Sequence, residues 1–241
     1  MQESIMPKLI CPNCNNSLLK INKIISKDEV EIGEAVILCE SCNSVFLVTN
    51  GIIDFLINPC VEIINEQKGW DTLKDAVKNT DELMLSLPDG LGEHKDFWRG
   101  QAENFYHMVS KLKLKGDEII LDLGAGRCWA SRYFAKFGCD VIGIDVLLPK
   151  YVGLLTSDIY IRSDNVYFER ILSDMNSLPF RNSIFDYVFV SASLHHSLNL
   201  STTLREISRV IKDNGELIII NEPVRGLILK KGMILKRKKL V

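Results

Sequence analysis

A strand-like segment followed at once by a glycine turn and a helix constrains the fold of this chain more than any other feature. Residues 118–123 are mostly apolar, Gly124-Ala125-Gly126 follows, and a helical stretch runs to about residue 137. Four further apolar stretches alternate with helical ones along the chain: 139–145, 166–174, 185–191 and 216–222. Because strands that alternate with helices form parallel sheets with right-handed crossovers, the sequence predicts an α/β fold with a doubly wound sheet.

The glycine turn does not match either of the common phosphate-binding loops. Trp129 stands where the dinucleotide fingerprint needs its third glycine, and a bulky residue there opposes the close approach of helix and strand. The chain also contains no G-x-x-x-x-G-K-[ST] segment, so a P-loop is excluded. The ligand of this sheet is therefore expected to be neither a dinucleotide nor a P-loop nucleotide.

Acidic residues stand at or near the ends of three predicted strands. Asp122 precedes the glycine turn by two residues, Asp145 ends the second strand and Asp174 ends the third. A carboxylate beside the turn repels pyrophosphate and attracts a cation, and one at the end of the second strand can accept hydrogen bonds from ribose hydroxyls. These acids predict a ligand that carries both a nucleoside and a positive charge.

These segments resemble the class I S-adenosylmethionine-dependent methyltransferases of the methyltransferase type 11 group. The resemblance covers about residues 100–224 and is carried by five motifs in family order: Leu121-Asp-Leu-Gly-Ala-Gly126, Val141-Ile-Gly-Ile-Asp145, Ser173-Asp-Met-Asn-Ser-Leu-Pro-Phe180, Phe185-Asp-Tyr-Val-Phe-Val-Ser-Ala-Ser-Leu-His-His196 and Arg205-Glu-Ile-Ser-Arg-Val-Ile-Lys-Asp-Asn-Gly-Glu-Leu217. It implies a Rossmann-like sheet, S-adenosylmethionine as cofactor and methyl transfer as the reaction.

The resemblance also implies which residues bind the cofactor. Seven residues match those positions of the family: Asp122, Gly124, Gly126, Asp145, Asp174, Met175 and Ser191. The first three would surround the methionine part, the fourth would hold the ribose, the next two would meet the adenine, and the last would lie at the mouth of the site. Cys128 departs from the pattern, because many family members have a third glycine there.

His195 and His196 follow the fourth predicted strand and are the candidate catalytic residues. The cofactor supplies the reactive carbon, so a base is needed only when the acceptor must lose a proton. Imidazole titrates near neutrality and suits this task, and we favour His195 of the two. The alternative is that the pair only shapes the pocket.

The acceptor is a small molecule in the interpretation that we favour. Ser191-Ala-Ser-Leu stands where enzymes that methylate adenine N6 or glutamine usually carry an Asn/Asp-Pro-Pro-aromatic motif, and neither Cys60 nor Cys139 is placed as the nucleophile of a cytosine C5 enzyme. Two alternatives stay open: an RNA or protein methyltransferase guided by the N-terminal domain, and a non-catalytic scaffold that binds the cofactor.

Two Cys-x-x-Cys pairs, 24 residues apart, dominate the first sixty residues. Four thiolates provide the ligands that tetrahedral Zn²⁺ prefers, and they leave no open coordination position for a reacting water: Cys11, Cys14, Cys39 and Cys42. The apolar stretches 34–38 and 45–48 are predicted strands on either side of the second pair. The sequence therefore predicts a small β zinc ribbon with a structural Zn²⁺; the alternative is free or redox-active dithiols.

The N-terminal region has a second resemblance, which covers roughly the first 57 residues. The cysteine pairs and the segment Gly51-Ile-Ile-Asp-Phe-Leu56 resemble the small zinc-ribbon protein that partners tRNA and rRNA methyltransferases in trans. This resemblance is the reason for keeping an RNA or protein acceptor as an alternative.

Charge is distributed unevenly along the 241 residues. The formal net charge is −2, but residues 225–241 contain seven basic and no acidic side chains, which leaves −9 on the remainder. The acidic charge of residues 1–224 argues against RNA as the acceptor, because contact with phosphates needs clustered basic side chains. The basic tail argues mildly for RNA. We find no secretory signal and no apolar stretch long enough to span a bilayer, so the expected compartment is the cytoplasm.

The chain is predicted to contain four segments: a zinc ribbon at 1–58, a linker with helices at 59–104, the cofactor-binding domain at 105–224 and the basic tail at 225–241. In the predicted helix 96–114, Trp98 and Tyr106 are interpreted as aromatic residues of the core or of an interface; the alternative is that they line a pocket. Only 19 residues follow Glu222, so the family's C-terminal strands are expected to be absent. The strand at 217–221 would then be an uncovered edge that invites a homo-oligomer.

Overall fold

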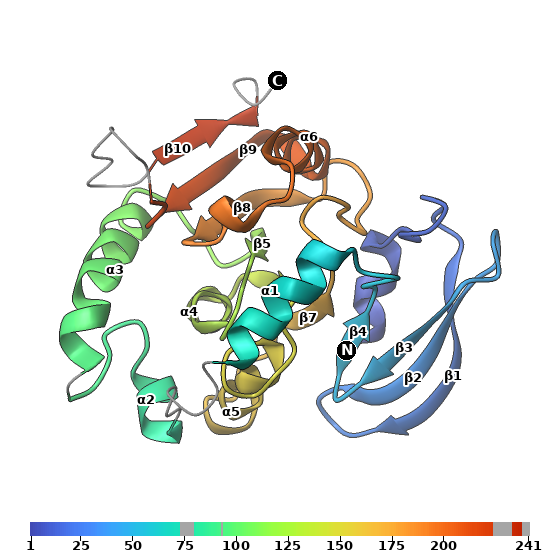
Figure 1. Cartoon of the computed structure of the whole chain (residues 1–241), viewed down its shortest axis with the longest axis horizontal. Helices are drawn as coiled ribbons and strands as arrows, with labels where there is room; N and C mark the ends of the chain where they lie inside the picture. Colours follow the sequence, from blue (N-terminus) through green and yellow to red (C-terminus); the bar gives the residue numbers. More distant parts are fainter. Residues whose placement is uncertain (73–79, 93, 224–232, 238–241) are drawn as a thin grey trace.

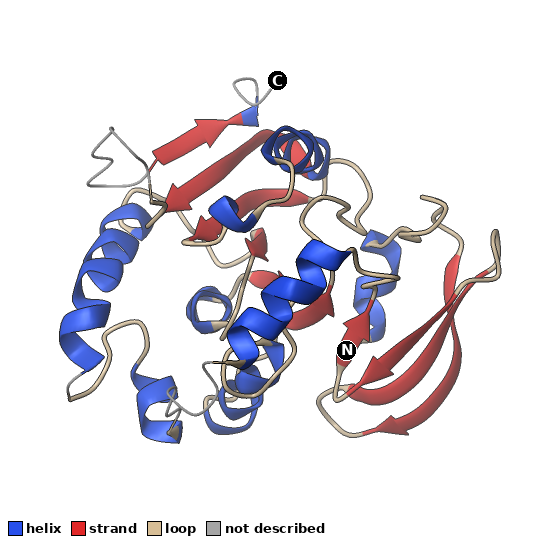
Figure 2. Ribbon diagram, in the orientation of Figure 1, coloured by secondary structure: helices blue, strands red, loops and turns tan. Residues whose placement is uncertain are grey.

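The computed structural model describes residues 1–72, 80–92, 94–223 and 233–237, which form a ten-stranded sheet covered by helices (Figures 1 and 2). The strands are β1 (Leu19–Lys27), β2 (Ile32–Cys39), β3 (Val45–Thr49), β4 (Ile52–Asp54), β5 (Ile119–Leu123), β6 (Asp140–Asp145), β7 (Glu169–Leu172), β8 (Phe185–Ser191), β9 (Ile211–Ile220) and β10 (Met233–Lys236). The α-helices are α1 (Val61–Asp71), α2 (Asp81–Ser86), α3 (His94–Val109), α4 (Trp129–Phe137), α5 (Asp158–Ser163) and α6 (Leu200–Val210). Three short 3₁₀ helices complete the description: η1 (Glu3–Lys8), η2 (Leu154–Ser157) and η3 (Leu194–His196).

The five strands predicted for the α/β part form the parallel centre of the sheet, in the order β7-β6-β5-β8-β9. β6 and β7 follow β5 in the chain and extend the sheet on one side of β5. The chain then crosses back, and β8 and β9 extend the sheet on the other side of β5. This reversal creates a switch point beside the carboxyl end of β5, the place where doubly wound sheets bind ligands. The prediction of a Rossmann-like α/β fold is confirmed.

Alternate residues of the central strands pack into separate cores on the two faces of the sheet. Leu121 and Leu123 pack with α6 and the N-terminal strands, whereas Ile120 packs with α3, α4 and α5. This alternation follows from the two-residue period of a β-strand. Because helices cover both faces, nearly every position of these strands is apolar.

The N-terminal strands continue the same sheet. β1, β2, β3 and β4 pair antiparallel in sequence order, and β4 pairs parallel to β7 with Ile53 opposite Ile171. The predicted strands at 34–38 and 45–48 are found within β2 and β3, and β1 completes the hairpin before the second cysteine pair. These antiparallel strands and the cysteine cluster fit a small zinc ribbon.

A buried ion pair joins the loop between β1 and β2 to β7. The Arg170 guanidinium is fully buried and donates to both carboxylate oxygens of Glu31, at 2.6 and 2.8 Å. Its other terminal nitrogen donates to Asp158 Oδ1 at 2.8 Å. A buried arginine is tolerated only when its charge is paired, so this contact couples the N-terminal strands to the central sheet.

The expectation that the fifth parallel strand is an uncovered edge is wrong. β10 pairs antiparallel with β9, with Ile234 opposite Ile218, and Arg237 forms an ion pair with Asp213. The segment 233–236, which was expected to belong to the basic tail, is therefore a strand, because its apolar residues pair with the apolar edge of β9. Because β10 covers the edge of β9, the reason for expecting a homo-oligomer through that edge no longer holds. The other residues of the predicted basic tail, at 225–232 and 238–241, lie outside the described residues.

Helical membrane spans are absent from the parts of the chain that the structure describes: no helix there is both long enough and apolar enough to cross a bilayer.

Candidate functional site

A cavity opens at the carboxyl ends of the parallel strands, beside the switch point. Its sheet side is formed by residues that follow β5, β6, β7 and β8, among them Gly124, Asp145, Asp174 and Ser191. Its other side is formed by α1 and the start of α3. Of the nine predicted cofactor-binding and catalytic residues, seven line this cavity: Gly124, Gly126, Asp145, Asp174, Met175, Ser191 and His196. Asp122 and His195 do not line it.

The turn after β5 depends on residues that tolerate a left-handed backbone. Gly124 has a φ of +73°, and a Cβ there would lie 2.4 Å from the Ser193 side chain. Cys128 adopts a φ of +58° at the position where many members of the resembled family have glycine. The turn therefore keeps its shape with a cysteine in this position, and its backbone can approach a ligand closely.

Asp122 lies behind the turn, where it anchors the first turn of α4. Its carboxylate accepts hydrogen bonds from the Ser131 backbone N–H at 3.0 Å and from the Ser131 hydroxyl at 2.6 Å. Burial raises the pKa of Asp122 to about 7, although both hydrogen bonds favour the ionised form. Asp122 thus fixes the position of the helix relative to the turn.

Asp145 ties the loop after β5 to the loop after β6. Its Oδ2 accepts a hydrogen bond from the Gly126 backbone N–H at 2.7 Å, and its Oδ1 accepts one from Leu147 N–H at 2.8 Å. Burial raises the pKa of Asp145 to about 6, against the effect of these two bonds. The carboxylate lines the cavity and has further lone pairs for ligand hydroxyls.

The residues after β7 and β8 complete the sheet side. Asp174 Oδ1 accepts from the backbone N–H and the side-chain amide of Asn176, at 2.8 and 3.0 Å, and Met175 follows with its side chain half-buried. The Ser191 hydroxyl accepts a hydrogen bond from the Asn221 side chain at 3.1 Å. The polar side chain of Asp174 and the apolar side chain of Met175 are therefore neighbours on the sheet side of the cavity.

The two histidines differ in their surroundings although their rings lie 4.1 Å apart. His196 lines the cavity, and its Nδ1 lies 3.1 Å from Glu66 Oε1 of α1. The hydrogen bond with Glu66 raises the pKa of His196. His195 points its Nδ1 at Glu222 Oε2, 2.8 Å away, outside the cavity. Glu222 also accepts from the Ser193 and Leu194 backbone N–H groups, so it organises η3.

Sequence reasoning missed most of the helical side of the site. Ile63, Glu66 and Trp70 of α1 line the cavity, as do Trp98 and Gln101 of α3. The spacing of the α1 residues by three and four is the only signal for this face, and it lies in a segment that appears polar and mixed.

The three tryptophans of the chain, Trp70, Trp98 and Trp129, all line the cavity. Trp98 is also buried in the core, so this residue both lines the cavity and packs in the core. Tyr106 does not line the cavity and donates a hydrogen bond to Asp89.

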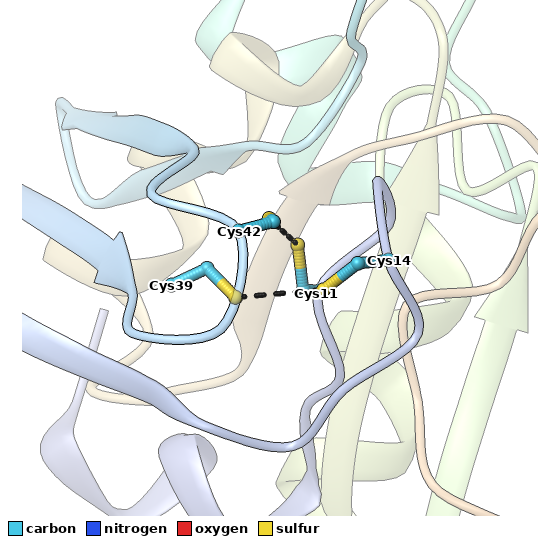
Figure 3. Close-up of side chains that lie close together, drawn as sticks. All are labelled: Cys11, Cys14, Cys39 and Cys42. Atoms are coloured by element: carbon cyan, nitrogen blue, oxygen red, sulfur yellow. Dashed lines mark hydrogen bonds between the residues drawn. The ribbon is translucent and has the colours of Figure 1, made fainter.

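The four cysteines of the N-terminal pairs converge at one point (Figure 3). The sulfur atoms of Cys11 and Cys42 lie 3.6 Å apart, as do those of Cys14 and Cys39, and all four lie within 4.8 Å of one another. A tetrahedral site with Zn–S bonds of about 2.3 Å has sulfur–sulfur edges of about 3.8 Å. The cluster therefore has the size and the donor set of a Cys₄ zinc site.

Part of the chain is similar to known proteins. Residues 121–219 match the sequence profile of a family described as "Methyltransferase domain". The sarcosine/dimethylglycine N-methyltransferase of Halorhodospira halochloris is 30% identical over 174 residues, which cover 68% of this chain and 50% of that protein. The demethylmenaquinone methyltransferase of Streptomyces avermitilis is 32% identical over 142 residues, or 56% of this chain and 58% of that one. The crystal structure of the PH0226 protein from Pyrococcus horikoshii has a TM-score of 0.48 and 25% identity, with 62% of this chain and 66% of that one covered.

The chain spans about half the length of the curated relatives that it matches. The matched region runs from the middle of β5 into β9 and includes the residues that form the sheet side of the cavity. Residues 121–219 therefore resemble a methyltransferase domain, and the comparisons support a class I S-adenosylmethionine-dependent methyltransferase.

Proposed function

We propose that this chain transfers the methyl group of S-adenosylmethionine to a small-molecule acceptor bound in the same cavity. The observation that carries the proposal is the cavity itself. One side of this cavity is lined by carboxylates and glycines at the ends of the parallel strands. The other side is lined by tryptophans of α1 and α3. Such a site offers polar groups for a nucleoside and an enclosed apolar surface for a second ligand.

The residues present fit the cofactor. Asp145 is placed to accept the ribose hydroxyls, and Asp174 with Met175 offers an acceptor and an apolar surface to the adenine. Gly124 and Gly126 line the cavity at the turn after β5, where the methionine part would lie. When bound, the cofactor supplies an electrophilic methyl group. The protein aligns the acceptor with that group, and alignment alone lowers such barriers by several kcal/mol.

His196 is the proposed base for an acceptor that must lose a proton. Its Nδ1 is held by Glu66, so Nε2 is the nitrogen that remains to accept a proton in the neutral ring. Glu66 would act as a positioning residue that fixes the ring and its tautomer. His195, in contact with Glu222, would hold the loop that carries His196.

A small acceptor is supported by the aromatic wall and by the relatives. Trp70 and Trp98 lie on the helical side of the cavity and narrow the space in front of the sheet. The named relatives act, by their names, on sarcosine, dimethylglycine and demethylmenaquinone. We also place the protein in the cytoplasm, where reduced thiols are available for metal binding.

RNA is the second candidate acceptor, and one observation favours it. A polar groove runs between the first cysteine turn and α6, and it is lined by Asn15, Arg181 and Arg205 among others. It adjoins the cavity through the segment that contains Asp174 and Asn176. Exposed arginines beside a zinc module are the groups that would contact phosphates.

The cysteine cluster is proposed to hold one structural Zn²⁺. All four ligand positions are protein thiolates, so the ion would have no open position for chemistry. Bound zinc would instead stabilise the turns that begin β1 and β3. Because β4 pairs with β7, that stabilisation would extend to the methyltransferase domain.

Incubation with S-adenosylmethionine that carries a tritiated methyl group tests the proposal. Purified protein is offered a metabolite extract and, separately, total RNA, with the Asp145→Ala variant as the control. We expect label in the metabolite fraction with the wild-type protein and none with the variant. Label found only in RNA would favour RNA over a small molecule as the acceptor. Label in neither fraction would count against methyl transfer by this protein.

A further inference from the structure

Arg127 is a cationic residue at a cavity whose other titratable lining residues are three acids and one histidine. It directly follows Gly126 in the turn after β5, and it is among the residues that line the cavity. Among the described residues that line the cavity, it is the one lysine or arginine. The carboxylates are those of Glu66, Asp145 and Asp174.

The guanidinium of Arg127 has an incomplete set of partners. Its Nε is buried and has no hydrogen-bond partner within the described part of the protein, and one terminal nitrogen donates to the Tyr151 carbonyl at a long 3.4 Å. Burial lowers the pKa of Arg127, but a guanidinium keeps its charge at any physiological pH. A charge so placed costs free energy unless something pairs with it.

The carboxylates of the cavity do not supply that pair. Glu66 contacts His196, Asp145 accepts from backbone N–H groups, and Asp174 accepts from Asn176. No ion pair to Arg127 is formed by any described residue. The missing partner is therefore expected to arrive with a ligand.

We propose that Arg127 binds a ligand carboxylate, an inference that rests on the proposed function. A carboxylate matches the planar fork of a guanidinium and can accept two hydrogen bonds from it. A phosphate with two charges would be repelled more strongly by the acids on the same walls. Two ligands of this site can carry a carboxylate: the methionine part of the cofactor, and the acceptor.

The first arm of the test compares two ligands of the cofactor site. S-adenosylhomocysteine carries the carboxylate, whereas 5′-methylthioadenosine has the same nucleoside and a thioether without the amino acid. Calorimetric titration is done with the wild-type protein, Arg127→Met and Arg127→Lys. If the cofactor supplies the carboxylate, Arg127→Met weakens S-adenosylhomocysteine binding about tenfold or more and leaves 5′-methylthioadenosine within twofold. Arg127→Lys keeps the charge but loses the planar guanidinium. Its affinity for S-adenosylhomocysteine should lie between those of the wild type and Arg127→Met.

The second arm tests the acceptor as the source. The protein saturated with S-adenosylhomocysteine is titrated with benzoate and, as the uncharged control, benzamide. If the acceptor supplies the carboxylate, the wild-type complex binds benzoate at least tenfold more tightly than benzamide, and Arg127→Met abolishes the difference. The proposal is overturned if Arg127→Met changes neither S-adenosylhomocysteine nor benzoate binding.

Failure of this inference can be told apart from failure of the proposed function. Wild-type protein that binds neither S-adenosylhomocysteine nor 5′-methylthioadenosine contradicts the cofactor site itself. Unchanged 5′-methylthioadenosine affinity in Arg127→Met shows that the variant is folded and that the site is intact. A variant with an altered thermal midpoint is replaced by Arg127→Gln, which keeps hydrogen-bond donors without the charge.

Discussion

The imidazole of His196 and the carboxylate of Glu66 meet across the mouth of the cavity, with Nδ1 and Oε1 3.1 Å apart. The two residues come from η3 and α1, 130 positions apart in the chain. This contact joins two residues that line the cavity and fixes the orientation of the His196 ring. A second contact from Gln67 to the Val146 carbonyl, at 2.7 Å, holds the same helix over β6.

Glu66→Gln is expected to lower the pKa of His196 toward the usual value of about 6.5, because the partner that favours the protonated ring is lost. Titration of the four histidines by NMR measures this directly. The stabilising effect of the raised pKa is present at low pH and lost as the pH rises through that pKa. Methylation that needs neutral His196 should increase over the same range, and Glu66→Gln should shift the increase to lower pH.

Glu62→Gln is the matched control, because Glu62 is exposed on the same helix. It should leave the titration of His196 unchanged. An identical His196 titration in wild type and Glu66→Gln would contradict the role given to the contact.

Asp122→Asn is expected to remove part of the pH dependence of stability. The folded pKa of Asp122, about 7, lies above the unfolded value near 4, so the folded state holds more protons between these values. This residue therefore contributes stability at low pH that is lost as the pH rises through 7, by no more than about 4 kcal/mol. Urea unfolding at pH 5.5 and pH 8 should show a smaller difference in Asp122→Asn than in the wild type. Equal differences would show that Asp122 is ionised throughout.

Glu31→Gln should destabilise the whole protein by about 3 kcal/mol, because it leaves the fully buried Arg170 without its main countercharge. Urea unfolding at neutral pH, followed by far-UV circular dichroism, measures the change. The control is Glu29→Gln, which alters an exposed residue of the same loop. A Glu31→Gln variant within 0.5 kcal/mol of Glu29→Gln would contradict a coupling between the N-terminal strands and β7.

Freshly purified protein is expected to contain about one zinc per chain, measured by atomic emission, and Cys39→Ser should lose most of it. Removal of the metal should lower the thermal midpoint of the whole chain, because the sheet is continuous from β1 to β9. Cys60→Ser, an exposed cysteine outside the cluster, is the control. Metal-free wild-type protein purified without chelators would contradict the zinc site.

Local patterns were enough to predict the parallel strands, because each is a largely apolar run that lies between helical stretches. They were also enough to predict the convergence of the cysteine pairs on one site. The wall made by α1 was not predictable from Ile63, Glu66 and Trp70 alone, because its position depends on contacts with His196 and Val146 far along the chain.

Two further features needed three-dimensional pairing. β10 is a run of only four residues, so its pairing with β9 decides its structure rather than its own periodicity. The direction of the Asp122 side chain depends on Ser131, nine residues later, which draws the carboxylate toward α4. Arg127 was overlooked because an arginine in a glycine turn is usually exposed, and only the burial of its Nε marks it out.

Calorimetric titration with S-adenosylhomocysteine tests the central claim, that the cavity beside β5 is the cofactor site, most directly. The wild-type protein should bind one equivalent. Asp145→Ala should weaken binding at least tenfold through loss of the ribose contacts, and Asp117→Ala, at an exposed turn, should bind like the wild type. No binding to the wild type at millimolar ligand, or equal affinity in Asp145→Ala, would contradict the account.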